Sequence, residues 1–153
     1  MSTVRARASG VLLALSALAG CASPQAPAAA GDGIRVSGAW VRPTPPGATA
    51  GAAYFTIASE RADTLTHVEP DDARFSGAEL HEMAHDANGA MAMRALPALA
   101  LAPGQLVTLA PGGRHVMLTG LRGGLGVGDS VALTLHFARA RALSVRLPVR
   151  DPQ

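Results

Sequence analysis

The sequence has no lysine, one cysteine, five aromatic residues and no long hydrophobic run in its 153 positions. A single cysteine excludes an internal disulfide framework and a CxxC redox or metal motif. The formal charge of +2 includes Arg5 and Arg7, and without these two, eleven arginines balance eleven acidic residues. Because no basic cluster remains, the composition argues against nucleic acid as a partner.

The N-terminal segment is typical of a bacterial lipoprotein signal. Arg5 and Arg7 precede an apolar run at 11–18 that is too short to span a bilayer comfortably, and small residues then lead to Cys21. The letters LAGC that end this segment match a lipobox. We therefore expect a signal peptide over 1–21, with Cys21 lipidated as the first residue of the mature protein. The alternative is an ordinary signal peptide with an incidental cysteine.

Two further regions follow the signal. Residues 22–32 are rich in proline and alanine and lack a hydrophobic period, so we expect a tether. Residues 33–150 have about the size of one ordinary domain. The lipid would place this domain in the periplasm or elsewhere in the cell envelope, with the anchor as its only contact with the membrane.

Short segments of alternating apolar and polar residues fill the domain. In DSVALTLHF, which begins at Asp129, valine, leucine and phenylalanine alternate with small or polar residues, which is the pattern of a half-buried β-strand. No window predicts an amphipathic helix of useful length. Turns rich in glycine and proline separate the predicted strands, which are 34–41, 52–58, 63–69, 78–84, 105–110, 129–137 and 142–149. We expect an all-β, Greek-key β-sandwich, with Trp40, Tyr54 and Phe137 anchoring its core.

Methionine and histidine gather in the segment 81–117. It contains every methionine after the initiator and three of the five histidines: Met83, Met91, Met93, Met117, His81, His85 and His115. Residues i and i+2 of a strand face the same side, so His115 and Met117 present an imidazole and a thioether together. His81 and Met83 repeat this pairing. Core packing, the usual role of any single methionine, is the alternative explanation.

The grouping favours a site for a soft metal ion. Met91 and Met93 follow the polar, turn-like stretch HDANG, so we expect them in a loop near the two strands. Thioethers are neutral and soft, and they suit Cu(I) but bind Zn(II), Mg(II) and Ca(II) poorly. A site without an anionic ligand should release its ion to an acceptor that contains thiolates. A blue-copper electron-transfer centre is excluded because the domain has no cysteine.

These residues resemble the signature of the PCu(A)C-type periplasmic copper chaperones, which is a histidine, a methionine after a fixed gap, and a His-x-Met pair. The matching residues are His81, Met93, His115 and Met117. The segments GAWVRPTPPGATAGAAYFTI, ELHE and LAPGGRHVMLTGL extend the resemblance over nearly the whole domain. The resemblance implies a cupredoxin-like β-sandwich that binds Cu(I) through those four side chains near one end. It also implies delivery of copper to the apo CuA domain of cytochrome c oxidase, directly or with a Sco-type thioredoxin-like copper protein.

The chain departs from the family pattern at one position. Many members have methionine directly after the first histidine, where this chain has Glu82; either Met83 compensates or the position is dispensable. Met83, His85 and Met91 are therefore additional candidate ligands, and His85 lies near enough to join a Cu(II)-bound form. His136 is expected to face solvent without a metal role.

The leading interpretation is a lipid-anchored Cu(I) chaperone without catalytic turnover. An envelope copper-sequestering or resistance protein with the same site is the alternative. An enzyme is disfavoured because no nucleophilic serine or cysteine stands beside a plausible base. A purely structural sandwich with methionine-rich packing would bind no metal at all.

Overall fold

The computed structural model describes residues 29–152, so the expected signal peptide, Cys21 and most of the expected tether lie outside the described residues. This part of the chain consists of eleven β-strands joined by turns. No helix occurs between residues 29 and 152, and hence none that is long and apolar enough to cross a membrane.

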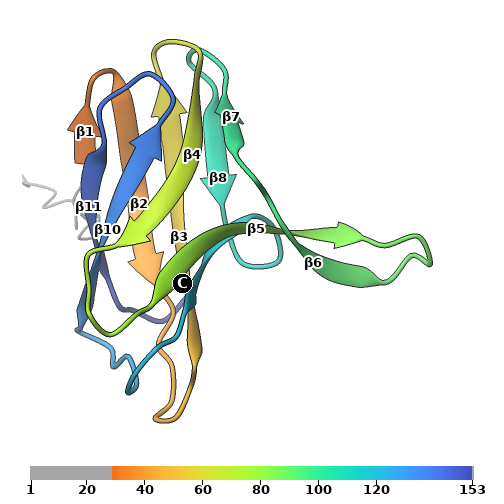
Figure 1. Cartoon of the computed structure of the whole chain (residues 1–153), viewed down its shortest axis with the longest axis vertical. Coiled ribbons are helices and arrows are strands. Elements are labelled where there is room, and N and C mark those ends of the chain that lie inside the picture. The colour runs from red at the N-terminus through yellow and green to blue at the C-terminus, as the bar shows by residue number, and fades with distance from the viewer. Residues whose placement is uncertain (1–28, 153) are drawn as a thin grey trace, which may run out of the picture.

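The strands form two antiparallel sheets (Figure 1). The larger sheet has the order β1-β2-β3-β9-β5-β6, with β8 also paired to β3. Its strands are β1 (Ala29–Gly31), β2 (Ile34–Val41), β3 (Ala50–Ser59), β5 (Gly77–His85), β6 (Met91–Ala95), β8 (Leu106–Leu109) and β9 (His115–Thr119). The smaller sheet has the order β11-β10-β4-β7. Its strands are β4 (Asp63–Pro70), β7 (Leu99–Leu101), β10 (Ser130–Phe137) and β11 (Leu143–Pro148).

The core lies between the two sheets and follows the alternation in the sequence. On β10, Val131, Leu133 and Leu135 are fully buried, whereas Thr134 and His136 point outward. Burying a leucine side chain stabilises the fold by about 1.5–3 kcal/mol. The same alternation buries Val116 and Leu118 on β9, and their neighbours on that strand face the other side of the sheet. The predicted all-β sandwich is confirmed.

The aromatic residues are distributed differently from the prediction. Phe55 and Phe75 are the buried phenylalanines of the core, whereas Trp40 and Phe137 are only half-buried. Trp40 lies on the outer face of the larger sheet and covers Tyr54, with the two ring centroids 4.6 Å apart. The alternation of β2 is shifted by a bulge before Trp40, so the sequence pattern alone places this side chain on the wrong face.

Three strands were not expected from the sequence. β1 occupies residues 29–31, which belonged to the expected tether, because it pairs with β2 along the sheet edge. β7 is a short strand whose residues Leu99 and Leu101 enter the core. β6 contributes almost nothing to the core, and its extended shape comes from pairing with β5 rather than from burial.

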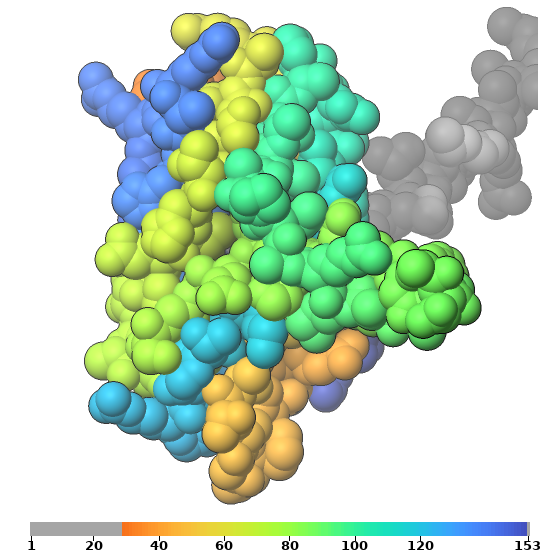
Figure 2. Space-filling model, turned by 45° about the vertical axis from the view of Figure 1, so that its right-hand side comes forward, coloured from red at the N-terminus to blue at the C-terminus, as the bar shows by residue number. Residues whose placement is uncertain are grey.

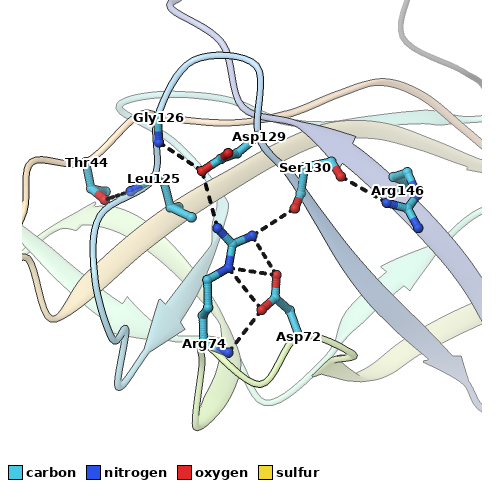
Figure 3. A network of polar contacts seen from close by, with 8 residues as sticks. All are labelled: Thr44, Asp72, Arg74, Leu125, Gly126, Asp129, Ser130 and Arg146. Carbon is cyan, nitrogen blue, oxygen red and sulfur yellow. Dashed lines mark hydrogen bonds and ion pairs between the residues drawn. The ribbon is translucent and has the colours of Figure 1, made fainter.

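A charged network fixes the loop that leads into β5 (Figure 3). The guanidinium of Arg74 donates to both carboxylate oxygens of Asp72, with a shortest distance of 2.7 Å, and to Asp129 at 3.3 Å. It also donates to the carbonyl of Ser130 at 2.9 Å. The hydrogen bonds from Arg74 hold the pKa of Asp72 below its usual value. The network therefore joins the β4–β5 loop to the start of β10.

The far part of the β5–β6 hairpin projects from the sandwich (Figure 1). In the space-filling view it forms the green lobe on the right of the molecule (Figure 2). Among the described strands, β6 pairs with β5 alone. Both faces of this hairpin are therefore open to solvent, whereas each sheet of the sandwich has one face turned toward the core.

Candidate metal centre

Two histidines that are far apart in the sequence face each other on the outer side of the larger sheet. β5 and β9 pair antiparallel, with His81 opposite His115. Their ring centroids are 5.9 Å apart, and the ring planes are inclined by 45°. A metal–nitrogen bond of about 2 Å plus a ring radius of about 1.1 Å allows centroids up to roughly 6 Å apart around one ion. The observed spacing fits two imidazoles on a shared ion.

Hydrogen bonding fixes the tautomer of His115. This side chain is buried, and its Nδ1 lies 3.1 Å from the carbonyl oxygen of Gly113. A carbonyl only accepts, so Nδ1 must carry the proton, and Nε2 of the neutral ring keeps a free lone pair. The same carbonyl accepts the backbone N–H of Met83 at 3.3 Å. Gly113 thus orients the imidazole and joins β9 to β5 at the site.

In His81 the ring nitrogen that remains free for a metal ion is Nδ1, not Nε2 as in His115. Its Nε2 lies 3.0 Å from Oε2 of Glu79, and the ionised carboxylate accepts the N–H. Nδ1 is then the nitrogen with the lone pair, and it is buried without a hydrogen-bond partner. Leaving a buried acceptor unpaired costs about 1–3 kcal/mol, so such atoms call for an ion or a water. A metal ion bound at Nδ1 would satisfy it.

The methionines of the predicted site lie on the same face but on different strands. Met117 follows His115 by two residues on β9 and is half-buried opposite Glu79. Met93 lies on β6, not in a loop as expected, and is 50% exposed. His81 pairs with Ala95 on β6, so Met93 is its diagonal neighbour, a position that long side chains can reach.

The register also explains the departure at position 82. Successive residues of a strand alternate between faces, so Glu82 points away from His81 and its metal-binding face. On that opposite face a carboxylate oxygen of Glu82 lies 3.7 Å from the guanidinium of Arg114, the residue directly before β9. Position 82 therefore adds no donor to the site, whereas Met83, two residues from His81, shares its face.

Residues 81–85 read HEMAH and so match the letters of the HExxH zinc-protease motif. On a helix this spacing brings both histidines to one metal ion. Here the segment belongs to β5, where His81 and His85 are about 13 Å apart at roughly 3.3 Å per residue. The strand separates the two imidazoles and turns Glu82 to the other face, so the site is not that of a zinc protease.

The donors on this face suit a soft ion. Within residues 29–152, no three His, Cys, Asp or Glu side chains are grouped so that they could hold a metal. An ion bound between His81 and His115 would complete its shell with thioethers, which favours Cu(I). Sequence reasoning missed Glu79 and the Gly113 carbonyl as orienting groups. The i−2 position of Glu79 on a strand was the available signal, whereas a backbone carbonyl leaves none.

A known protein family matches most of the described domain. The model described as "LpqE-like: Putative lipoprotein LpqE-like" matches residues 34–149. The chain belongs to this family. A curated relative, "Putative lipoprotein Lxx21020" of Leifsonia xyli subsp. xyli (strain CTCB07), is 35% identical over 151 residues, covering 95% of this chain and 89% of the relative.

Solved PCuAC domains share the fold of this family member. The "Copper-bound PCuAC domain from PmoF2" is 28% identical, with a TM-score of 0.65, over 82% of this chain and 98% of that domain. The "Solution structure of CuI-DR1885 from Deinococcus Radiodurans" is 27% identical, with a TM-score of 0.56, over 87% of this chain and 83% of that one. These similarities confirm the predicted PCu(A)C resemblance and the cupredoxin-like β-sandwich.

Proposed function

We propose that this chain is a lipid-anchored copper chaperone of the cell envelope, which binds one Cu(I) through His81, Met93, His115 and Met117. The observation that carries the proposal is the pair of facing imidazoles, His81 and His115, whose hydrogen bonds leave Nδ1 of one ring and Nε2 of the other free. The two methionines lie on the same sheet face.

The donor chemistry and the comparisons both favour copper. Two neutral imidazoles provide borderline ligands and two thioethers provide soft ones. A thioether has no proton to lose, and an imidazole binds the metal in its neutral form. The solved structures of similar PCuAC domains include one described as copper-bound and one as a CuI form. Both are similar over most of their length to this chain.

The neutral ligands favour transfer over storage or catalysis. A Cu(I) ion held by four neutral groups keeps its full positive charge, so an acceptor with thiolates binds it more strongly. We propose the apo CuA domain of cytochrome c oxidase as the final acceptor, reached directly or through a Sco-type thioredoxin-like copper protein. Lipidation of Cys21 would hold the chaperone at the membrane surface, and the lipoprotein names of the family and of its relative support this anchor.

Binding is tested by competition with a chromogenic Cu(I) chelator under anaerobic conditions. The full chain carries Cys21→Ser, which removes its only thiol. Met93→Leu and Met117→Leu preserve volume and should each weaken binding by about tenfold or more, roughly 1.4 kcal/mol. Leu106→Met, which adds a thioether at an exposed position on β8, should leave the affinity unchanged. Wild-type affinity in both leucine variants would show that the ligand assignment is wrong.

Transfer distinguishes the chaperone from the copper-sequestering alternative. The Cu(I)-loaded chain is mixed with an apo CuA domain, and the absorption bands of the assembled centre are recorded. A chaperone should produce these bands and lose its own copper, whereas a sequestering protein should retain its copper against the same acceptor. A parallel mixture with Met117→Leu checks that the copper comes from the proposed site.

A further inference from the structure

The end of the β5–β6 hairpin carries soft ligands that the proposed centre does not use. Met91 and Met93 are 51% and 50% exposed, so neither fills a core. Met93 belongs to the proposed centre, but Met91 and the exposed His85 form the last pair of the hairpin before its turn. A large exposed methionine beside an exposed histidine calls for a role other than packing.

The strand register arranges these side chains as two successive pairs on one face. Met83 is opposite Met93, and His85 is opposite Met91. The intervening pair, Ala84 and Ala92, points to the other face. Directly opposed side chains have Cβ atoms about 4.5–5.5 Å apart, which lets an imidazole nitrogen and a thioether sulfur reach one ion.

The turn at the end of the hairpin holds this register in place. Oδ1 of Asp86 accepts the backbone N–H groups of Asn88 at 2.8 Å and Ala90 at 2.9 Å. The backbone N–H of Asp86 donates to the carbonyl of Ala90 at 2.8 Å, and Gly89 supplies the positive φ of 81° that the turn requires. The pair next to this turn is therefore presented by an ordered hairpin.

The geometry points to a second Cu(I) site at the hairpin end, made by His85 and Met91, which loads the proposed centre through the Met83–Met93 pair. Successive pairs along a strand are about 7 Å apart, so the ion would pass from one pair to the next in short steps. The inference rests on the proposed function for the identity of the cargo. Beyond that function, the inference assigns the end of the hairpin as the position where copper first binds the protein.

Each step along this route is a ligand exchange without redox chemistry. As the ion moves inward, its bonds to the Met91 sulfur and to the His85 nitrogen break one after the other, and bonds to the Met83 and Met93 sulfurs replace them, while copper stays Cu(I) with the same charge. Only neutral donors take part, so no proton is released when histidine is already neutral. An outer site with two donors should bind more weakly than the four-donor centre, so the centre should fill first.

Silver(I), a soft ion without accessible redox chemistry, tests the outer site by NMR of ¹³C-methyl-labelled methionine. The full chain is used in detergent with Cys21→Ser. The first equivalent should shift the methyl signals of Met93 and Met117, and the second should shift that of Met91. In the double variant His85→Ala/Met91→Leu, the second binding event should be lost and the first retained.

A matched variant removes similar groups elsewhere. His67→Ala/Leu106→Ala deletes an exposed imidazole and an exposed apolar side chain from the sandwich, and it should keep both events. Stopped-flow mixing with a Cu(I)–chelator complex measures the rate at which copper fills the inner centre. This rate should be several-fold lower in His85→Ala/Met91→Leu than in wild type, and it should be unchanged in His67→Ala/Leu106→Ala.

The outcomes separate this inference from the proposed function. If the first equivalent shifts Met117 but Met91 never responds, the outer site is wrong and the inner centre stands. A Met91 surface that serves only to dock a protein partner would give this result. If none of the methionine methyl groups responds to the metal, both proposals are wrong.

Discussion

Glu79 should determine which nitrogen of His81 meets the metal. Its carboxylate accepts the Nε2–H of His81 at 3.0 Å, leaving Nδ1 bare and buried. Glu79→Ala removes this acceptor, so the ring is free to place its proton on Nδ1 instead. Copper binding must then restore the other tautomer and the ring orientation before coordination can occur.

The expected loss can be estimated from the exposure of the pair. Groups that orient a metal-binding histidine typically contribute 10- to 100-fold to metal affinity. Glu79 is 63% exposed on its side chain, whereas that of His81 is 12% exposed, so water screens one partner of the bond. We therefore expect the lower end, a weakening of about tenfold, or roughly 1.4 kcal/mol.

Two measurements check this prediction. Chelator competition gives the Cu(I) affinity, and long-range ¹H–¹⁵N NMR reports which ring nitrogen of His81 carries the proton. Glu79→Gln keeps an oxygen acceptor without the charge, and it should preserve both the tautomer and most of the affinity. Equal affinity in wild type and Glu79→Ala, with the Nε2–H tautomer unchanged, would refute the claim that Glu79 determines which nitrogen of His81 is free.

Two predictions concern stability. Because Arg74 lowers the pKa of Asp72, this pair contributes stability above the unfolded carboxyl pKa, about 3.9, which is lost as pH falls through the lower folded value. Asp72→Asn should cost about 1–2 kcal/mol in urea unfolding at pH 7, and a cost that persists undiminished at pH 3 would contradict the ionic origin. Gly120→Ala should cost about 1–3 kcal/mol, because Gly120 has a φ of 64° and a Cβ there would collide with Ser76 Oγ. Thermal unfolding should show that adding Ser76→Ala recovers only part of this loss, since the backbone strain remains.

The alternation of apolar residues was enough to predict the sandwich. On β10 and β11 it names the buried leucines and valines correctly, because a half-buried strand needs an apolar residue at every second position. β6 was not predicted because it lacks this apolar alternation. Its residues are mostly exposed, so only pairing with β5 makes them a strand, and pairing is not visible in a local pattern.

The donor residues were likewise visible in the sequence, but their arrangement was not. The His-x-Met spacing of His115 and Met117 follows from the period of a strand and needs no tertiary information. The register of β5 against β9 decides that His81 faces His115. It also turns Glu82 toward Arg114 and away from that face.

The sequence by itself determined the chemical type of the described domain: an all-β fold with imidazole and thioether donors gathered in one segment. Tertiary structure alone decided which nitrogens are free, because Gly113 and Glu79 act through hydrogen bonds that depend on how strands meet. Pairing between strands that are distant in the sequence places these hydrogen-bond partners, and the periodicity of a single strand does not reveal that pairing.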